Sequence, residues 1–127
     1  MPDIVYSTGP IEIEPGVTQL RLKALNNSPL AQTVQARVYE LDGTKVLFAI
    51  RNFSLPSGSS NLATINIGTL NEIEVQFTVS NAQVLVAVFG VKPLQGSFSA
   101  ANSVRHQEMV NLTAGVTDSQ EQSTDTP

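Results

Sequence analysis

The chain has 127 residues, the size of one domain with a buried core, and a net charge of −4. Only 14% of its residues are charged and its seven basic residues are scattered, which argues against binding to nucleic acid. It has no cysteine, so disulfides and thiolate metal sites are excluded.

The first half of the chain reads as a series of short strands. Small apolar pieces at 3–7 and 11–14 surround Gly9-Pro10. Apolar and polar residues then alternate through 20–24 and 33–41, the period of a strand with one buried face. Asp42-Gly43 follows and favours a tight hairpin turn into the run 45–53.

The second half continues the pattern. The run 72–79 is the cleanest half-buried strand, because every second residue is Ile, Val or Phe. Ser80-Asn81-Ala82 is predicted to join it to 84–91 as a second hairpin. The spacing predicts an all-β fold: an immunoglobulin-like or jelly-roll-like antiparallel β-sandwich of about seven to nine strands.

The domain is expected to occupy residues 1–112, with a body over 1–93 and an extra segment over 94–112. The extra segment mixes apolar and polar residues and is predicted to add a last strand at 104–112. Residues 113–127 form a polar, acidic tail without a basic residue, and we expect this tail to be flexible.

Two of the predicted strands, 45–53 and 84–91, are apolar on both faces, although the outer face of a sandwich needs no apolar surface. Their second faces are covered either by the segments 98–112 or 3–14 of the same chain, or by another molecule. The second alternative predicts a subunit interface that includes Val46, Leu47, Phe48, Phe53, Leu85, Phe89, Val91, Ile4 and Tyr6. A terminal segment that adds a strand to a neighbouring molecule would combine the two alternatives.

The residues that could carry chemistry form no recognised motif. His106 is the single histidine and no Gly-x-Ser-x-Gly elbow accompanies it, so we expect a surface or packing role. The pairs Glu12/Glu14 and Glu72/Glu74 would each share one strand face and could hold Ca²⁺ or act as an acid/base pair if the strands were neighbours. The simpler expectation is a solvated strand face. We therefore expect no enzyme activity, no catalytic residue, no cofactor and no metal.

Three segments in order carry a resemblance to a known family. They are Leu25-Asn26-Asn27-Ser28, then Val34 to Gly43 ending in Asp-Gly, then Leu55-Pro56-Ser57-Gly58-Ser59-Ser60. In these turns the chain resembles immunoglobulin-like sandwich domains of the CARDB and fibronectin-III type over residues 17–92. The resemblance implies a fold and a binding or spacer role, and it carries over no functional residue.

These observations favour a non-enzymatic structural protein, a β-sandwich subunit that forms a homo-oligomer, a fibre or a surface layer. The alternative is an immunoglobulin-like binding or adhesion module that recognises a protein or glycan ligand through loops such as 26–33 and 56–61. The chain start shows no classical signal peptide and its longest apolar run, 84–91, is too short to span a bilayer, so no membrane insertion is expected. The location stays open between a cell, spore or virion surface and the cytoplasm.

Overall fold

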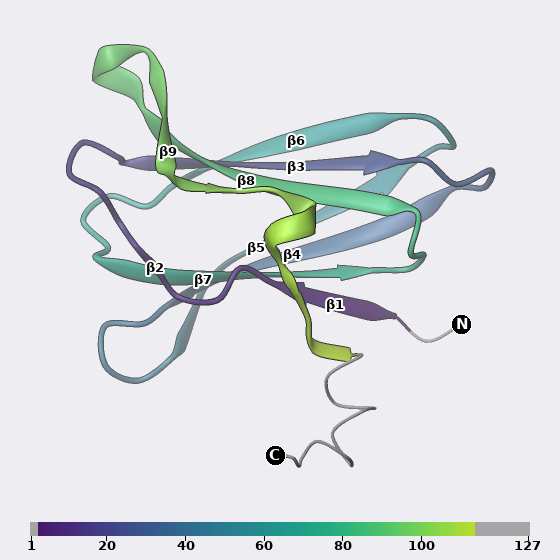
Figure 1. Ribbon diagram of the computed structural model, residues 1–127, viewed down its shortest axis with the longest axis horizontal. Coiled ribbons are helices and arrows are strands. Elements are labelled where there is room, and N and C mark those ends of the chain that lie inside the picture. The colour runs from purple at the N-terminus through teal and green to yellow at the C-terminus, as the bar shows by residue number, and fades with distance from the viewer. Residues whose placement is uncertain (1–2, 114–127) are drawn as a thin grey trace.

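The computed structural model of the chain describes residues 3–113 and shows two antiparallel β-sheets packed face to face (Figure 1). The chain is thus all-β, as the alternation predicts. The strands and 3-10 helices among these residues are, in order, β1 (Ile4–Ser7), β2 (Ile11–Glu12), β3 (Gln19–Asn26), β4 (Gln32–Glu40), β5 (Val46–Leu55), β6 (Ser60–Asn66), β7 (Glu72–Val79), β8 (Val84–Lys92), η1 (Pro93–Gln95), β9 (Ser97–Val104), η2 (His106–Glu108) and β10 (Val110–Asn111).

The six-stranded sheet has the order β10-β1-β7-β4-β5, and β2 pairs with β7 beside β1. The central strand β7 points Ile73, Val75, Phe77 and Val79 into the core, and none of the four has exposed surface. Strand β5 is the edge of this sheet, and its one antiparallel partner among the described residues is β4. The hairpin predicted at Asp42-Gly43 is confirmed, and Gly43 has the positive φ that the turn needs.

The four-stranded sheet has the order β6-β3-β8-β9. Strand β9 pairs with β8 and carries a large bulge, because Val88 lies opposite Val104 while Gly90 lies opposite Ser99. The bulge brings Asn102 over Gly90, where a Cβ on Gly90 would lie 2.6 Å from the Cβ of Asn102. A glycine is therefore required at position 90 by the close approach of β9.

The core lies between the two sheets and consists of the inward residues of both. Its largest fully buried side chains include Phe77 from the six-stranded sheet and Leu20 and Leu22 from β3. Val84, Val86 and Val88 of β8 also point inward and are buried. Half of the double apolar pattern of 84–91 is thus the ordinary core face of a sandwich strand.

The second predicted hairpin is wrong. Residues 80–83 connect β7 of the six-stranded sheet to β8 of the four-stranded sheet, so this turn is an arch between the layers. The physical reason is that both edges of β7 are already paired, one with β4 and the other with β1 and β2. The open position for β8 is beside β3, where Leu22 lies opposite Val88.

The segment predicted as an addition to the body is part of the sandwich. Its main strand is β9, at 97–104, while the strand expected over 104–112 is reduced to the two residues of β10, which pair with β1. The tail expected at 113–127 lies outside the described residues except for Thr113, whose Oγ1 accepts a hydrogen bond from the amide of Val5. Among residues 3–113, no helix is long and apolar enough to cross a membrane.

Candidate functional site

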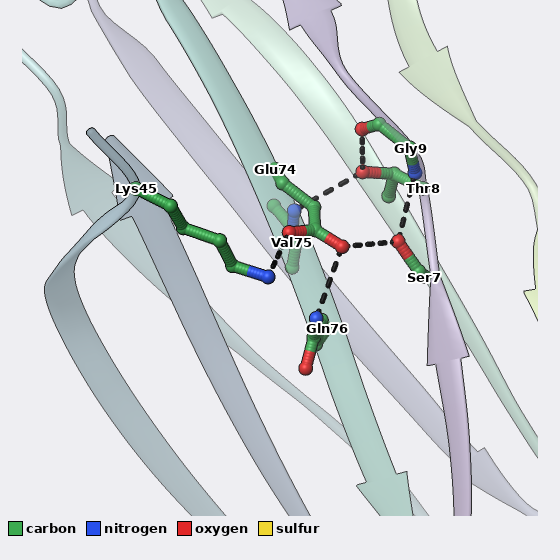
Figure 2. Close-up of polar contacts among 7 residues, drawn as sticks. All are labelled: Ser7, Thr8, Gly9, Lys45, Glu74, Val75 and Gln76. Carbon is green, nitrogen blue, oxygen red and sulfur yellow. Dashed lines mark hydrogen bonds and ion pairs between the residues drawn. The ribbon is translucent and has the colours of Figure 1, made fainter. Parts of the chain in front are cut away.

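Glu74, one of the predicted carboxylates, is the centre of a polar cluster on the outer face of β7 (Figure 2). Its Oε1 lies 2.7 Å from the Nζ of Lys45, and its Oε2 accepts hydrogen bonds from Ser7 Oγ at 2.5 Å and Gln76 Nε2 at 3.0 Å. Partial burial raises the pKa of Glu74, but these contacts outweigh it and hold the pKa below the ordinary value. The cluster holds an ionised carboxylate between β1, β7 and the β4–β5 hairpin.

Glu14, from the other predicted pair, belongs to a second cluster, where the segment after β2 meets β9. Its Oε1 accepts a hydrogen bond from Ser99 Oγ at 2.7 Å and lies 2.9 Å from Lys92 Nζ. The bond from Ser99, followed by that from Lys92, lowers the pKa of Glu14. Beside it, the buried amide of Asn102 donates to Glu12 O and accepts from Glu14 N, which ties β9 to the β2 segment of the other sheet.

The two carboxylate pairs do lie on neighbouring strands, because Glu12 is directly opposite Glu72. They do not form one site: Glu14 and Glu74 are each neutralised by a separate lysine. No group of three or more His, Cys, Asp or Glu side chains in residues 3–113 is arranged to hold a metal ion. The arrangement ties strands and loops together, and we find in it no shared chemistry for the four carboxylates.

His106 lies in η2 and contacts β8 and β1. Its Nδ1 accepts a hydrogen bond from the amide of Val86 at 3.2 Å, and its ring meets Tyr6 edge-on with centroids 4.5 Å apart. Burial lowers the pKa of His106, so the ring is neutral near pH 7 and Nδ1 is free of a proton. These are the contacts of a packed side chain that fixes η2 against β8.

Four residues of the predicted interface are buried or partly buried within the chain itself. Phe53 is 6% exposed within the core, so its predicted place in an interface with another molecule is wrong. Val91 is 8% exposed opposite Phe98 of β9 and is likewise covered within the chain. Ile4 and Tyr6 are partly buried against the core, because β1 pairs with β7 of its own chain.

Three of the predicted interface residues are exposed apolar side chains at the start of β5. Val46, Leu47 and Phe48 are 52%, 45% and 43% exposed, and Ile50 adds a fourth side chain at 39%. We call these four residues the β5 patch. It lies on an edge strand next to the β4–β5 turn, where residues 3–113 leave it exposed.

The remaining two predicted residues, Leu85 and Phe89, lie on the outer face of the four-stranded sheet. They line two adjoining hollows of about 510 and 400 Å³, which share Lys23, Phe89 and Arg105. We call the two hollows together the β3–β8 groove. The segment 98–112 borders this groove without filling it: Phe98 lies beside Phe89 with ring centroids 5.7 Å apart, and His106 borders the end near Leu85.

Sequence reasoning missed the basic side of this groove. Arg21 and Lys23 alternate with buried residues on β3, and Arg105 follows β9, so Arg105 is far from the other two cations in the sequence. The alternation of 20–24 signals that Arg21 and Lys23 share a face. Their meeting with Phe89 follows from the pairing of β3 with β8, where Arg21 lies directly opposite Phe89.

The comparisons with known proteins support the fold and no function. No protein-family model matches the chain, and no curated protein sequence matches it. The structure is similar to the crystal structure of Thermotoga maritima 1070, with a TM-score of 0.50, 8% identity, and coverage of 87% of this chain and 92% of that chain. A second similar structure, the Anabaena sensory rhodopsin transducer, has a TM-score of 0.42, 13% identity, and coverage of 68% and 80%. Neither names the CARDB or fibronectin-III type, so that resemblance stays a prediction.

Proposed function

We propose that the protein is a non-enzymatic structural subunit that self-associates through the β5 patch. The observation that carries the proposal is the exposure of four large apolar side chains, Val46, Leu47, Phe48 and Ile50, on one open sheet edge. An apolar cluster at an unpaired edge exposes both side chains and backbone groups to a partner. A second copy of the chain offers the same surface and can bury both.

The composition of β5 supports this reading. Natural edge strands are usually protected from pairing by charges or proline, but Arg51 is the single charged residue among the ten residues of β5. The low charge of the whole chain adds little repulsion between copies. Edge and composition together favour contact with a second copy over solvation.

A bulge determines how such a contact would form. Val38 pairs with Ala49 and Tyr39 pairs with Leu47, so Phe48 is an extra residue without an opposite partner on β4. Such a bulge interrupts the regular ladder and re-aims the side chain. We therefore place packing of the apolar side chains at the centre of the contact, with backbone pairing to the second copy on either side of Phe48. A symmetric contact would give a closed dimer, and a head-to-tail contact would give a fibre or surface layer.

The test is the native mass of the full chain, measured by light scattering over a concentration series and accompanied by negative-stain microscopy. We expect the wild type to form dimers or larger particles, and Phe48→Glu to reduce them to single chains because a carboxylate would be buried in the contact. Leu94→Glu is the matched control, since Leu94 on η1 is 103% exposed and lies outside the β5 patch. A wild type that stays monomeric at high concentration would contradict the proposal.

A second candidate function is recognition of a partner through the loops around 26–33 and 56–61. One observation favours it: the buried amide of Asn26 donates to the carbonyls of Leu30 and Leu55, and Ser57 Oγ donates to Ser28 O. These bonds fix the two loops as one unit with Leu30 70% exposed at its surface. A monomeric native mass would favour this alternative over self-association.

A further inference from the structure

The β3–β8 groove has an unusual charge for this protein. The chain carries a net charge of −4, yet its larger hollow is lined by Arg21, Lys23 and Arg105 with Glu108 as the one acid. Glu108 Oε1 accepts a hydrogen bond from the amide of Arg105 at 2.7 Å, so this carboxylate is held at the start of η2. Among residues 3–113 the ion pairs use Lys45 and Lys92, so the three groove cations are left without a carboxylate partner there.

The apolar side of the groove is aromatic. The rings of Phe89 and Phe98 lie 5.7 Å apart at an angle of 59°, and both border the larger hollow. The guanidinium carbon of Arg21 lies 5.3 Å from the centre of the Phe98 ring, a cation–π distance. Aromatic walls and cations therefore meet in one place.

Arg21 is also incompletely satisfied. Its Nε is buried and has no hydrogen-bond partner among the described residues. An unpaired buried donor is unfavourable, and guanidinium groups bind carboxylate or phosphate through two parallel hydrogen bonds. A small adjustment of the Arg21 side chain toward an anion would satisfy this donor, which makes Arg21 the natural anchor for a negatively charged group.

From these observations we infer that the β3–β8 groove binds a small molecule in which an anionic group, carboxylate or phosphate, is attached to an apolar ring. The anion contacts Arg21, Lys23 and Arg105, and the ring packs against Phe89 and Phe98. The larger hollow, of about 510 Å³, suits a molecule of this size. Three cations are too few to hold a nucleic acid on a chain of net negative charge.

The first experiment uses 2-naphthoate as the probe, added to the isotope-labelled full chain and followed by amide NMR shifts. We expect saturable binding with a Kd of about 1 mM or tighter, with shifts at Arg21, Phe89 and Phe98. Inorganic phosphate has the charge without the ring, and 2-naphthylmethanol has the ring without the charge. We expect each to bind at least about tenfold more weakly. Equal binding of either one, or shifts centred elsewhere, would overturn the inference.

The second experiment removes the cations. Arg21→Gln and Arg105→Gln are each expected to weaken 2-naphthoate binding by about tenfold or more, because each loses a charge-assisted contact. Arg51→Gln is the matched control, since Arg51 is an exposed arginine on β5 whose guanidinium donates to Ile50 O. Unchanged affinity in both groove variants would overturn the inference, as would tighter binding of an acidic peptide to the same residues.

The groove and the β5 patch lie on different sheets. The variant Phe48→Glu, which tests self-association, is therefore expected to keep its affinity for 2-naphthoate. Loss of ligand binding in that variant would show that the ligand needs the assembled form, and it would overturn a site built by one chain.

Discussion

Strands β5 and β8 have the same sequence character and very different positions. Both alternate so that large apolar residues appear on each face. In the fold, β8 lies between β3 and β9, whereas β5 is the edge of the other sheet. The outer face of β8 is partly enclosed by Phe98 and η2 as the wall of a groove, while the first half of β5 stays exposed. A doubly apolar strand thus indicates a surface that needs a cover, but the topology decides what covers it.

The largest effect is expected within β5, where the comparison can be made between two phenylalanines. Phe53 is 6% exposed and Phe48 is 43% exposed. Phe53→Ala is expected to lower the free energy of unfolding by about 3–5 kcal/mol, since it removes a large core side chain. Phe48→Ala is expected to change it by about 0.5 kcal/mol or less at low protein concentration, where the proposal expects single chains. Urea unfolding of both variants measures the difference, and equal losses would show that the two halves of β5 are not distinct.

A smaller effect is expected where β9 closes over β8. Gly90→Ala would place a Cβ against Asn102, which cannot move freely because its amide is bonded to Glu12 O and Glu14 N. We expect a loss of about 1–3 kcal/mol in urea unfolding, the usual range for overpacking.

The double variant with Asn102→Gly is the control for this close contact. It removes the opposing Cβ, so the added cost of Gly90→Ala should be smaller in that background. An undiminished cost would place the strain elsewhere and would remove Asn102 as the reason for the glycine.

The smallest effect concerns the pH dependence of the contact between η2 and β8. Burial lowers the pKa of His106 from its ordinary value of 6.5, and Lys23 and Arg105 border the same hollow while Tyr6 packs on the ring. The unfolded chain therefore binds the proton more readily than the folded chain. Stability is full above pH 6.5 and falls as the pH drops from there through the lower folded pKa.

Urea unfolding between pH 7 and pH 5 measures this loss. Glu14 and Glu74 also have lowered pKa values, but their contribution is lost only as the pH falls below about 4.5, outside this window. His106→Asn keeps an acceptor for the Val86 amide and removes the titrating ring, so its stability should be flat over the window. An equal slope in the variant would assign the pH dependence to other groups.

Much of the sandwich could be predicted because individual strands and tight turns have local sequence patterns. The alternation in 72–79 identifies the buried face of β7, and Asp42-Gly43 identifies a hairpin. The assignment of β8 to the other sheet could not be predicted, because a short turn such as 80–83 can serve as a hairpin or as an arch. The choice depends on which strands already pair with β7, which is a property of the whole fold.

For the candidate sites, the sequence predicted surplus apolar residues on β5 and β8 but not the cations that line the groove. The exposure of Val46, Leu47 and Phe48 agrees with an unpaired surface at β5. Phe53 continues the same apolar run in the sequence, but the end of the strand lies over the core. The groove could not be predicted without knowing which strands pair, because Arg21 meets Phe89 only across the β3–β8 ladder. Sequence patterns thus identified surplus apolar faces, and only the topology showed that one of them is lined with cations.

Hydrogen–deuterium exchange over a range of protein concentrations tests the central claim most directly, because it reports the contact strand by strand. Self-association through the β5 patch predicts that the amides of Val46 to Ile50 become protected as the concentration rises. It also predicts that exchange at Leu85 to Phe89, in the groove, stays constant. Concentration-dependent protection at 85–89 without change at 46–50, or no dependence at either place, would contradict the account.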